Sequence, residues 1–133
     1  MASSYPLNPK QFTAVLALSG PDRFQHFISR VADWQNVWGL RDENGWVSAS
    51  DDEGNLAFPF WPHPDYAAAC ATDKWLGNLP DSVEIHEFLE HWLPNMGKDG
   101  VAVAVFPTPT MRGTVVLALQ LQQAIQDELS RIE

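Results

Sequence analysis

The spacing of apolar residues changes from a helical to an extended period at Val37, and this change constrains the fold more than any other feature. Before it, apolar residues recur every three or four positions, which is the spacing of one buried helix stripe. The stripe consists of Phe24, Phe27, Ile28, Val31 and Trp34. After Val37, short runs alternate with turn residues as far as position 61, as strands do. Separate helical and extended stretches are typical of an α+β protein.

Two turns divide the extended stretch. The first, Asp42-Glu43-Asn44-Gly45, contains an Asn-Gly pair that favours a hairpin, and the second is Asp52-Glu53-Gly54-Asn55. The sequence therefore predicts an antiparallel meander of three strands, over residues 37–41, 46–50 and 56–61. Pro59 cannot donate a backbone hydrogen bond, so we expect the third strand to be an edge at that point or to end there.

The remaining elements complete an α+β prediction. Residues 101–106 form a near-continuous apolar run, which is typical of a central strand covered on both faces, and we expect residues 114–116 to pair with it. Pro94 should end or kink a helix over residues 87–96. Other helices are expected over residues 9–19, 21–34, 65–75 and 117–132. The prediction is one domain, residues 1–133, with an antiparallel or mixed sheet of about four to six strands packed with about five helices.

The charge of the chain narrows the choice of partner. Eight Lys plus Arg stand against 17 Asp plus Glu, which gives a formal net charge of −9. The bases are scattered singly, and no patch of them could displace counterions from phosphates. This argues against DNA, RNA and anionic membranes. We expect an unknown protein, including a basic one, or a small neutral ligand as the partner.

The single cysteine, Cys70, cannot form an internal disulfide, and the first residues resemble no secretory signal. No apolar run reaches the roughly 18 to 20 residues of a membrane span. We therefore expect a cytoplasmic location. Cys70 stands among alanines with no adjacent base, so close packing explains it better than thiol reactivity.

Recognised catalytic and metal motifs are absent from the sequence. His86 and His91 are five positions apart, which separates them by roughly 140° around a helix, so one helix cannot present both to one ion. No nucleophile elbow, phosphate loop or dinucleotide fingerprint occurs. We accordingly nominate no catalytic residue, no metal ligand and no cofactor.

A corner rich in proline and aromatic residues is the candidate binding site. Three prolines, at positions 59, 62 and 64, hold the junction between the third strand and the next helix. The candidate binding residues there are Phe58, Trp61, His63, Asp65 and Tyr66. They could line a ligand or peptide groove, or they could be core residues whose prolines only direct the chain. A His63 and Asp65 acid–base couple is a further reading, although no nucleophile stands nearby in the sequence.

The chain resembles a small bacterial family catalogued as domain of unknown function 2750, over nearly its whole length. The resemblance rests on the strings Leu7-Asn8-Pro9-Lys10-Gln11-Phe12, Arg30-Val31-Ala32-Asp33-Trp34, Val37-Trp38-Gly39-Leu40, Trp61-Pro62-His63-Pro64, Glu87-Phe88-Leu89, Trp92-Leu93-Pro94 and Val105-Phe106-Pro107-Thr108. It implies a compact cytosolic protein and no particular activity.

Two functions follow as hypotheses. The first is a non-enzymatic protein-binding module with aromatic anchors. The alternative is a small-molecule-binding protein or enzyme with its site at Trp61, His63, Asp65 and Tyr66. A closed pocket with the His63 and Asp65 side chains together on its floor would favour the alternative.

Overall fold

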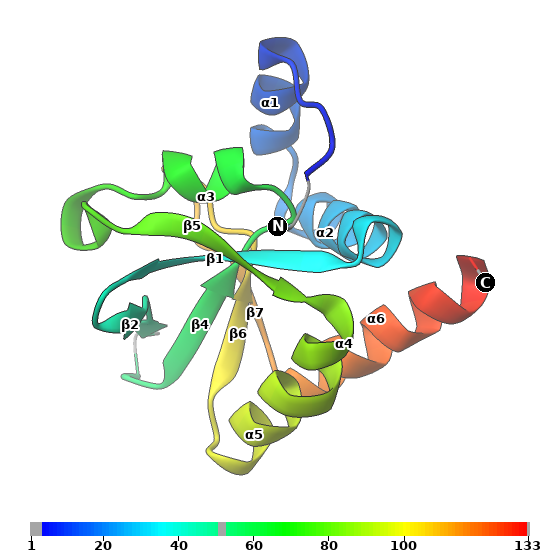
Figure 1. Cartoon of the computed structure of the whole chain (residues 1–133). Helices are drawn as coiled ribbons and strands as arrows, with labels where there is room; N and C mark the ends of the chain where they lie inside the picture. Colours follow the sequence, from blue (N-terminus) through cyan, green and yellow to red (C-terminus); the bar gives the residue numbers. More distant parts are fainter. Residues whose placement is uncertain (1–3, 51–52, 133) are drawn as a thin grey trace.

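The computed structural model describes residues 4–50 and 53–132, and its strands form two sheets (Figure 1). The first sheet has the order β2-β1-β5 and the second has the order β3-β4-β6-β7. Among these described residues five helices accompany the sheets, if the continuous helical segment that contains Pro94 is taken as one. The α+β class is confirmed, and the strands are divided between two sheets.

The first sheet is antiparallel throughout. It consists of β1 (Asn36–Asp42), β2 (Gly45–Trp46) and β5 (Leu79–Glu84). The predicted Asn-Gly turn joins β1 to β2. There the backbone N–H of Asn44 donates to Oδ1 of Asp42 at 2.8 Å, and Gly45 takes a φ of 127°, which favours glycine.

The second sheet is mixed. It consists of β3 (Ala49–Ser50), β4 (Leu56–Phe60), β6 (Ala102–Val105) and β7 (Thr114–Val116). Strands β4 and β6 are parallel, whereas β3 and β7 are antiparallel to their neighbours. The central position of β6 and its pairing with residues 114–116 are confirmed. Pairing with β3 reaches only Leu56 and Ala57, so at Pro59 strand β4 pairs with β6 alone.

The predicted meander was wrong in one respect, because its second strand is broken. Residues 46–50 divide between β2, in the first sheet, and β3, in the second. The sheets meet instead at Trp38 and Trp61, whose backbone groups exchange hydrogen bonds of 2.9 and 2.7 Å. The turn predicted at residues 52–55 lies partly outside the described residues.

The predicted helices form with local capping. Asn8 caps α1 (Pro9–Leu16) in a reciprocal pair with Gln11, and Ser19 caps α2 (Gly20–Trp34). The helix predicted over residues 65–75 is shorter than expected. It divides into α3 (Pro64–Ala69) and the 3-10 turn η1 (Asp73–Trp75). The C-terminal helix is α6 (Ala118–Ile132).

Pro94 lies inside a helical segment that continues past it. The segment runs through α4 (Ile85–Glu87), a π-helical turn η2 (Phe88–Trp92) and α5 (Leu93–Lys98). In the wide turn the N–H of Leu93 donates to the carbonyl of Phe88. A proline ring clashes with the carbonyl four residues before it, and a π turn relieves such crowding. The expected disturbance is therefore a wide turn, and the helix does not end at Pro94.

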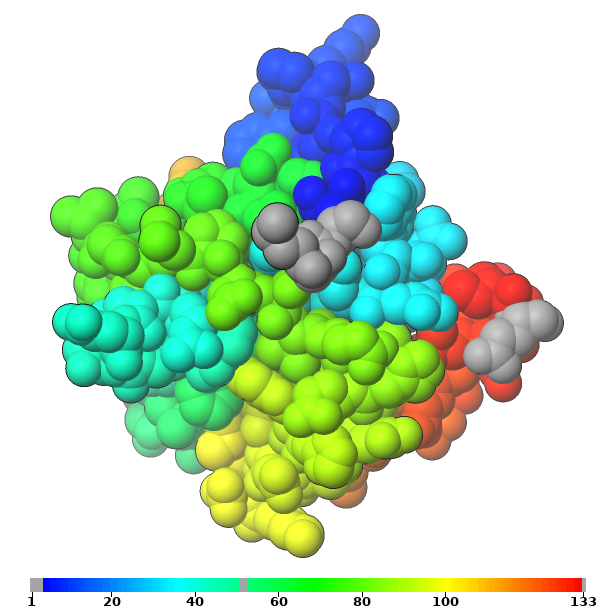
Figure 2. Space-filling model, in the orientation of Figure 1, coloured from blue at the N-terminus to red at the C-terminus, as the bar shows by residue number. Residues whose placement is uncertain are grey.

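The helices cover the sheets from different sides. Helix α3 packs on β1 and β5, whereas α6 packs against α2, α5 and β6. The largest fully buried side chains are Trp61, Tyr66, Phe27, Phe60, Phe88 and Phe106. Helix α1 has no buried residue and projects from the body at the N-terminal end (Figures 1 and 2). No helix in the described part of the chain is long and apolar enough to cross a membrane.

Candidate functional site

The predicted corner residues lie mostly inside the molecule. Trp61, His63 and Tyr66 are buried, Phe58 is half-buried and Asp65 is exposed. The His63 and Asp65 side chains approach to 3.9 Å. Asp65 borders an open hollow beside α1, but His63 does not line it. None of the four main hollows in the described part of the chain is lined by both His63 and Asp65.

Both ring nitrogens of His63 are engaged in hydrogen bonds. Nδ1 accepts from the backbone N–H of Asp65 at 3.0 Å, which caps α3. Because Nδ1 accepts, the ring proton resides on Nε2, which lies 2.8 Å from the carbonyl oxygen of Tyr5 and donates to it. The imidazole thus ties the N-terminal segment to α3, and neither nitrogen is left to act as an acid or base.

Three other ionisable groups near the corner, those of Tyr66, Tyr5 and Cys70, are held in their protonated forms. Burial raises the pKa of the Tyr66 hydroxyl to about 12, and burial, with a further contribution from the Tyr66 hydroxyl, also raises the pKa of Tyr5. Burial raises the pKa of the Cys70 thiol to about 11, and its Sγ lies 3.4 Å from the carbonyl of Pro107. Cys70 is buried and packs in the core, as the sequence predicted.

Metal-ligand geometry does not occur among residues 4–50 and 53–132, where no group of three His, Cys, Asp or Glu side chains is placed to hold an ion. His86 and His91 pair separately with carboxylates. Nδ1 of His86 lies 2.7 Å from Glu84, and Nε2 of His91 lies 3.8 Å from Glu87.

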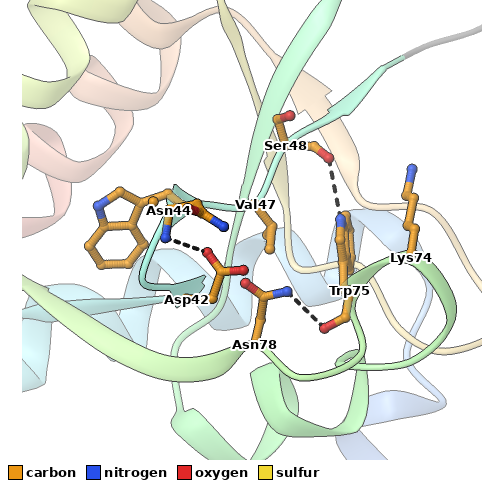
Figure 3. Close-up of a pocket in the computed structure, with 9 residues that line it drawn as sticks. Asp42, Asn44, Val47, Ser48, Lys74, Trp75 and Asn78 are labelled. Atoms are coloured by element: carbon orange, nitrogen blue, oxygen red, sulfur yellow. Dashed lines mark hydrogen bonds between the residues drawn. The ribbon is translucent and has the colours of Figure 1, made fainter.

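Two surface hollows lie on either side of the turn that carries Lys74 and Trp75. The first, which we call the indole hollow, has a volume of about 310 Å³ (Figure 3). It is lined by Asp42, Asn44, Gly45, Trp46, Val47, Ser48, Lys74, Trp75 and Asn78. Two indole walls with carboxylate, amide and hydroxyl groups between them suit a partner that combines apolar and polar groups.

Trp75 is fixed in place between the hollows. Its indole N–H donates to the carbonyl of Ser48 at 3.3 Å, and its own carbonyl accepts from the side-chain amide of Asn78 at 3.0 Å (Figure 3). Its ring packs edge to face with the ring of buried Trp61, with 6.2 Å between the ring centres and an angle of 88° between the ring planes. Trp61 therefore supports the site from behind, although it does not face solvent.

Trp46 forms the other wall of the indole hollow and is equally fixed. Its ring lies on Gly39, where an added Cβ would approach the indole to 3.0 Å. The Trp92 ring contacts the Trp46 ring edge to face, with 5.0 Å between their centres, and the Arg41 guanidinium lies 5.2 Å from the centre of the Trp46 ring. A rigid aromatic wall loses little conformational entropy when a partner binds.

The second hollow, which we call the alanine hollow, has a volume of about 420 Å³ and lies over the second sheet. All four strands contribute to its lining, through Ala49 and Ser50 of β3, Ala57 of β4, Ala104 of β6 and Val115 of β7. The opposite face of the sheet carries larger residues, such as Phe60, whose ring packs on Phe88 at 4.9 Å. Small side chains on one face leave the space that forms the hollow.

The loop over residues 107–113 forms one wall of the alanine hollow. Oγ1 of Thr108 accepts from the backbone N–H groups of Thr110 and Met111, at 3.3 and 2.9 Å. Gly113 lies so close to the sheet that an added Cβ would be 2.8 Å from the carbonyl oxygen of Val105. Trp61 donates its indole N–H to the carbonyl of Pro107 at 2.8 Å. The loop is therefore fixed to the sheet at both ends.

Arg23 of α2, which is only 2% exposed, anchors the same loop. Its guanidinium donates to the carbonyls of Phe106, Leu18 and Arg112, at 3.1, 2.6 and 3.3 Å. Phe106 has a φ of 55°, an unfavourable value for this residue type, and the bond from Arg23 holds its carbonyl in that conformation.

The sequence interpretation did not include Arg23, Lys74 or Trp75 among the site residues. A signal for Arg23 existed, since it lies four positions before Phe27 and eight before Val31, on the buried face of α2. For Trp75 the sequence predicted a helix, and nothing local indicated that an irregular turn would bring it against Ser48.

Two short sheets that meet at Trp38 and Trp61, with five helices around them, define a small α+β protein. Residues 24–125 match the model of the family described as "Protein of unknown function (DUF2750)". The match covers more than half of the 133 residues, and the chain belongs to this family. No curated protein and no solved structure matches the chain.

Proposed function

We propose that the protein is a non-enzymatic binding module that holds an extended segment of another protein against the Lys74–Trp75 turn. The observation that carries this proposal is the exposure of two leucines directly after the turn, where Leu76 is 76% and Leu79 is 70% exposed. Two large apolar side chains in water beside an aromatic wall are typical of a protein contact surface.

The surface around the turn supports a segment that carries both apolar and basic side chains. The hollows on either side of Trp75 can accept side chains, since alternate residues of an extended peptide point to opposite sides. The carboxylate of Asp42 lines the indole hollow, and the net charge of −9 attracts a basic partner at long range. We place this interaction in the cytoplasm.

The corner residues are used in structural hydrogen bonds and packing, which supports a binding role over a catalytic one. Both nitrogens of His63 are used in structural hydrogen bonds, and the Cys70 thiol is buried with a raised pKa. A general base needs a free nitrogen, and a nucleophilic cysteine needs a lowered pKa.

The test is affinity capture with the tagged full chain from extracts of its own cells. We compare the wild type with the double variant Leu76→Ser, Leu79→Ser. Because both side chains are exposed, the variant should fold. Each leucine that becomes buried against the partner contributes roughly 1.5 to 3 kcal/mol to the free energy of binding. Recovery of the specific partner should therefore fall by about 10-fold or more.

The matched control is the double variant Leu117→Ser, Leu119→Ser. These leucines are likewise exposed, but they lie at the start of α6, which packs against α2, α5 and β6, and they do not follow the Lys74–Trp75 turn. Capture should be retained in this control. Equal losses in both variants, or no partner above background for the wild type, would contradict the proposal.

A second candidate function is the binding of a small neutral molecule in the alanine hollow. Its support is the concave floor of small side chains, with a volume of about 420 Å³. Screening of neutral compounds by thermal shift should then give hits. The variant Ala49→Phe should lose these hits, because Ala49 is half-buried in the floor and the added ring fills the hollow. Hits that persist in this variant would place the ligand elsewhere.

A further inference from the structure

The guanidinium of Arg23 is buried among neutral acceptors. In the described part of the chain no carboxylate lies within ion-pair distance of it. Besides the three carbonyls, its Nη1 contacts the thioether sulfur of Met111 at 3.5 Å. Burial lowers the pKa of Arg23, as expected when a cation lacks a counter-charge. A thioether is a weak acceptor, so the contact with Met111 is the weakest of the four that the guanidinium makes.

Met111 is also open to solvent. It is 38% exposed and lines the alanine hollow, whereas Met96 is 6% exposed within the core. A small oxidant such as a peroxide can therefore reach Met111 much more easily than Met96.

We propose that Met111 is an oxidation site whose sulfoxide accepts a hydrogen bond from Arg23 and tightens the loop over the alanine hollow. In the reaction the thioether sulfur attacks a peroxide oxygen. An S–O bond forms, the O–O bond breaks, and hydrogen peroxide leaves as water. The sulfur loses two electrons and the peroxide gains them.

The sulfoxide changes the contact in a defined direction. Its oxygen carries a large partial negative charge and accepts strongly from a cation, unlike the thioether it replaces. The new bond adds a fourth oxygen acceptor to the guanidinium that already holds Phe106 and Arg112. Oxidation here strengthens a packing contact, whereas methionine oxidation in a core disrupts packing.

The test treats the full chain with hydrogen peroxide and follows each methionine by peptide mass spectrometry. Met111 should be oxidised several-fold faster than Met96, because its side chain is far more exposed. The melting temperature of the singly oxidised protein should rise by about 3 °C, the shift that one additional charge-assisted bond gives in a chain of this length.

Two variants separate the effect of the Met111 sulfoxide on the melting temperature from the effects of oxidation at other residues. Met111→Gln places an amide oxygen near Arg23, and it should show a raised melting temperature without peroxide. Met111→Leu keeps the volume without an acceptor, and peroxide should leave its melting temperature unchanged. Faster oxidation of Met96, or a lower melting temperature after oxidation of Met111 alone, would overturn the proposal.

Discussion

The Nε2–H of His63 donates to the carbonyl oxygen of Tyr5 at 2.8 Å, across 58 positions of the sequence. The same ring caps α3 through Nδ1. One buried imidazole therefore joins the N-terminal segment to the helix that covers the first sheet.

Replacement of His63 should separate these two roles. His63→Ala removes both hydrogen bonds and should lower the free energy of unfolding by about 2–3 kcal/mol. His63→Asn keeps a cap for α3 but cannot also reach Tyr5, so its loss should be roughly half as large. Urea denaturation measures both, and equal losses in the two variants would contradict the division.

The two tyrosines should resist ionisation while the protein is folded. Burial raises the pKa of Tyr66 from 10.0 to about 12, and it raises that of Tyr5 as well. Since the unfolded chain loses these protons first, stability should fall as the pH rises above about 10. Phenolate absorbance should therefore appear together with unfolding. Tyr66→Phe should move the alkaline transition to higher pH, and an absorbance change well before unfolding would refute the prediction.

His26 should reduce stability in weak acid. Burial, followed by the nearby charge of Arg30, lowers the pKa of His26 below its usual 6.5. Below that pH the unfolded chain takes up a proton that the folded protein refuses, so stability falls as the pH falls. Urea denaturation from about pH 7.5 to about pH 5.5 should show a decline that His26→Phe reduces. The carboxylate of Glu84, whose pKa is lowered from 4.5, stays ionised in this range.

Gly113 should tolerate no side chain. In Gly113→Ala the new Cβ meets the backbone oxygen of Val105, so the loop or the sheet must move, at a cost of about 1–3 kcal/mol. Gly97→Ala in α5 is the control. Its Cβ makes an ordinary 3.5 Å contact with Leu119, and alanine stabilises a helix by roughly 0.5–1 kcal/mol over glycine. Thermal denaturation of both variants tests this contrast, and a neutral Gly113→Ala would contradict it.

Local features of the fold could be predicted because neighbouring residues determine them. The Asn8 cap, the stripe of α2 and the Asn-Gly turn each depend on interactions within a few positions. The parallel pairing of β4 with β6 joins residues about 45 positions apart, and no local pattern encodes that register.

The candidate site was only partly predictable for the same reason. An aromatic and proline-rich corner indicates rigidity, but whether Trp61 points inward depends on the distant residues Pro107 and Trp75. The binding role predicted for the corner residues stays a prediction. The alanine hollow arises from small residues on four strands, and only the assembled sheet brings those residues together.

The parallel pair of β4 and β6 also determines when the second sheet can form during synthesis. Residues 61–101, which include α3, η1, β5 and the helical segment that contains Pro94, must be made before β6 exists. At roughly 5 to 20 residues per second, the ribosome needs several seconds for this stretch. During that interval β4 lacks its longest partner and its aromatic side chains lack their cover. We therefore expect formation of the second sheet to be delayed, with apolar strand surface exposed to aggregation during this interval.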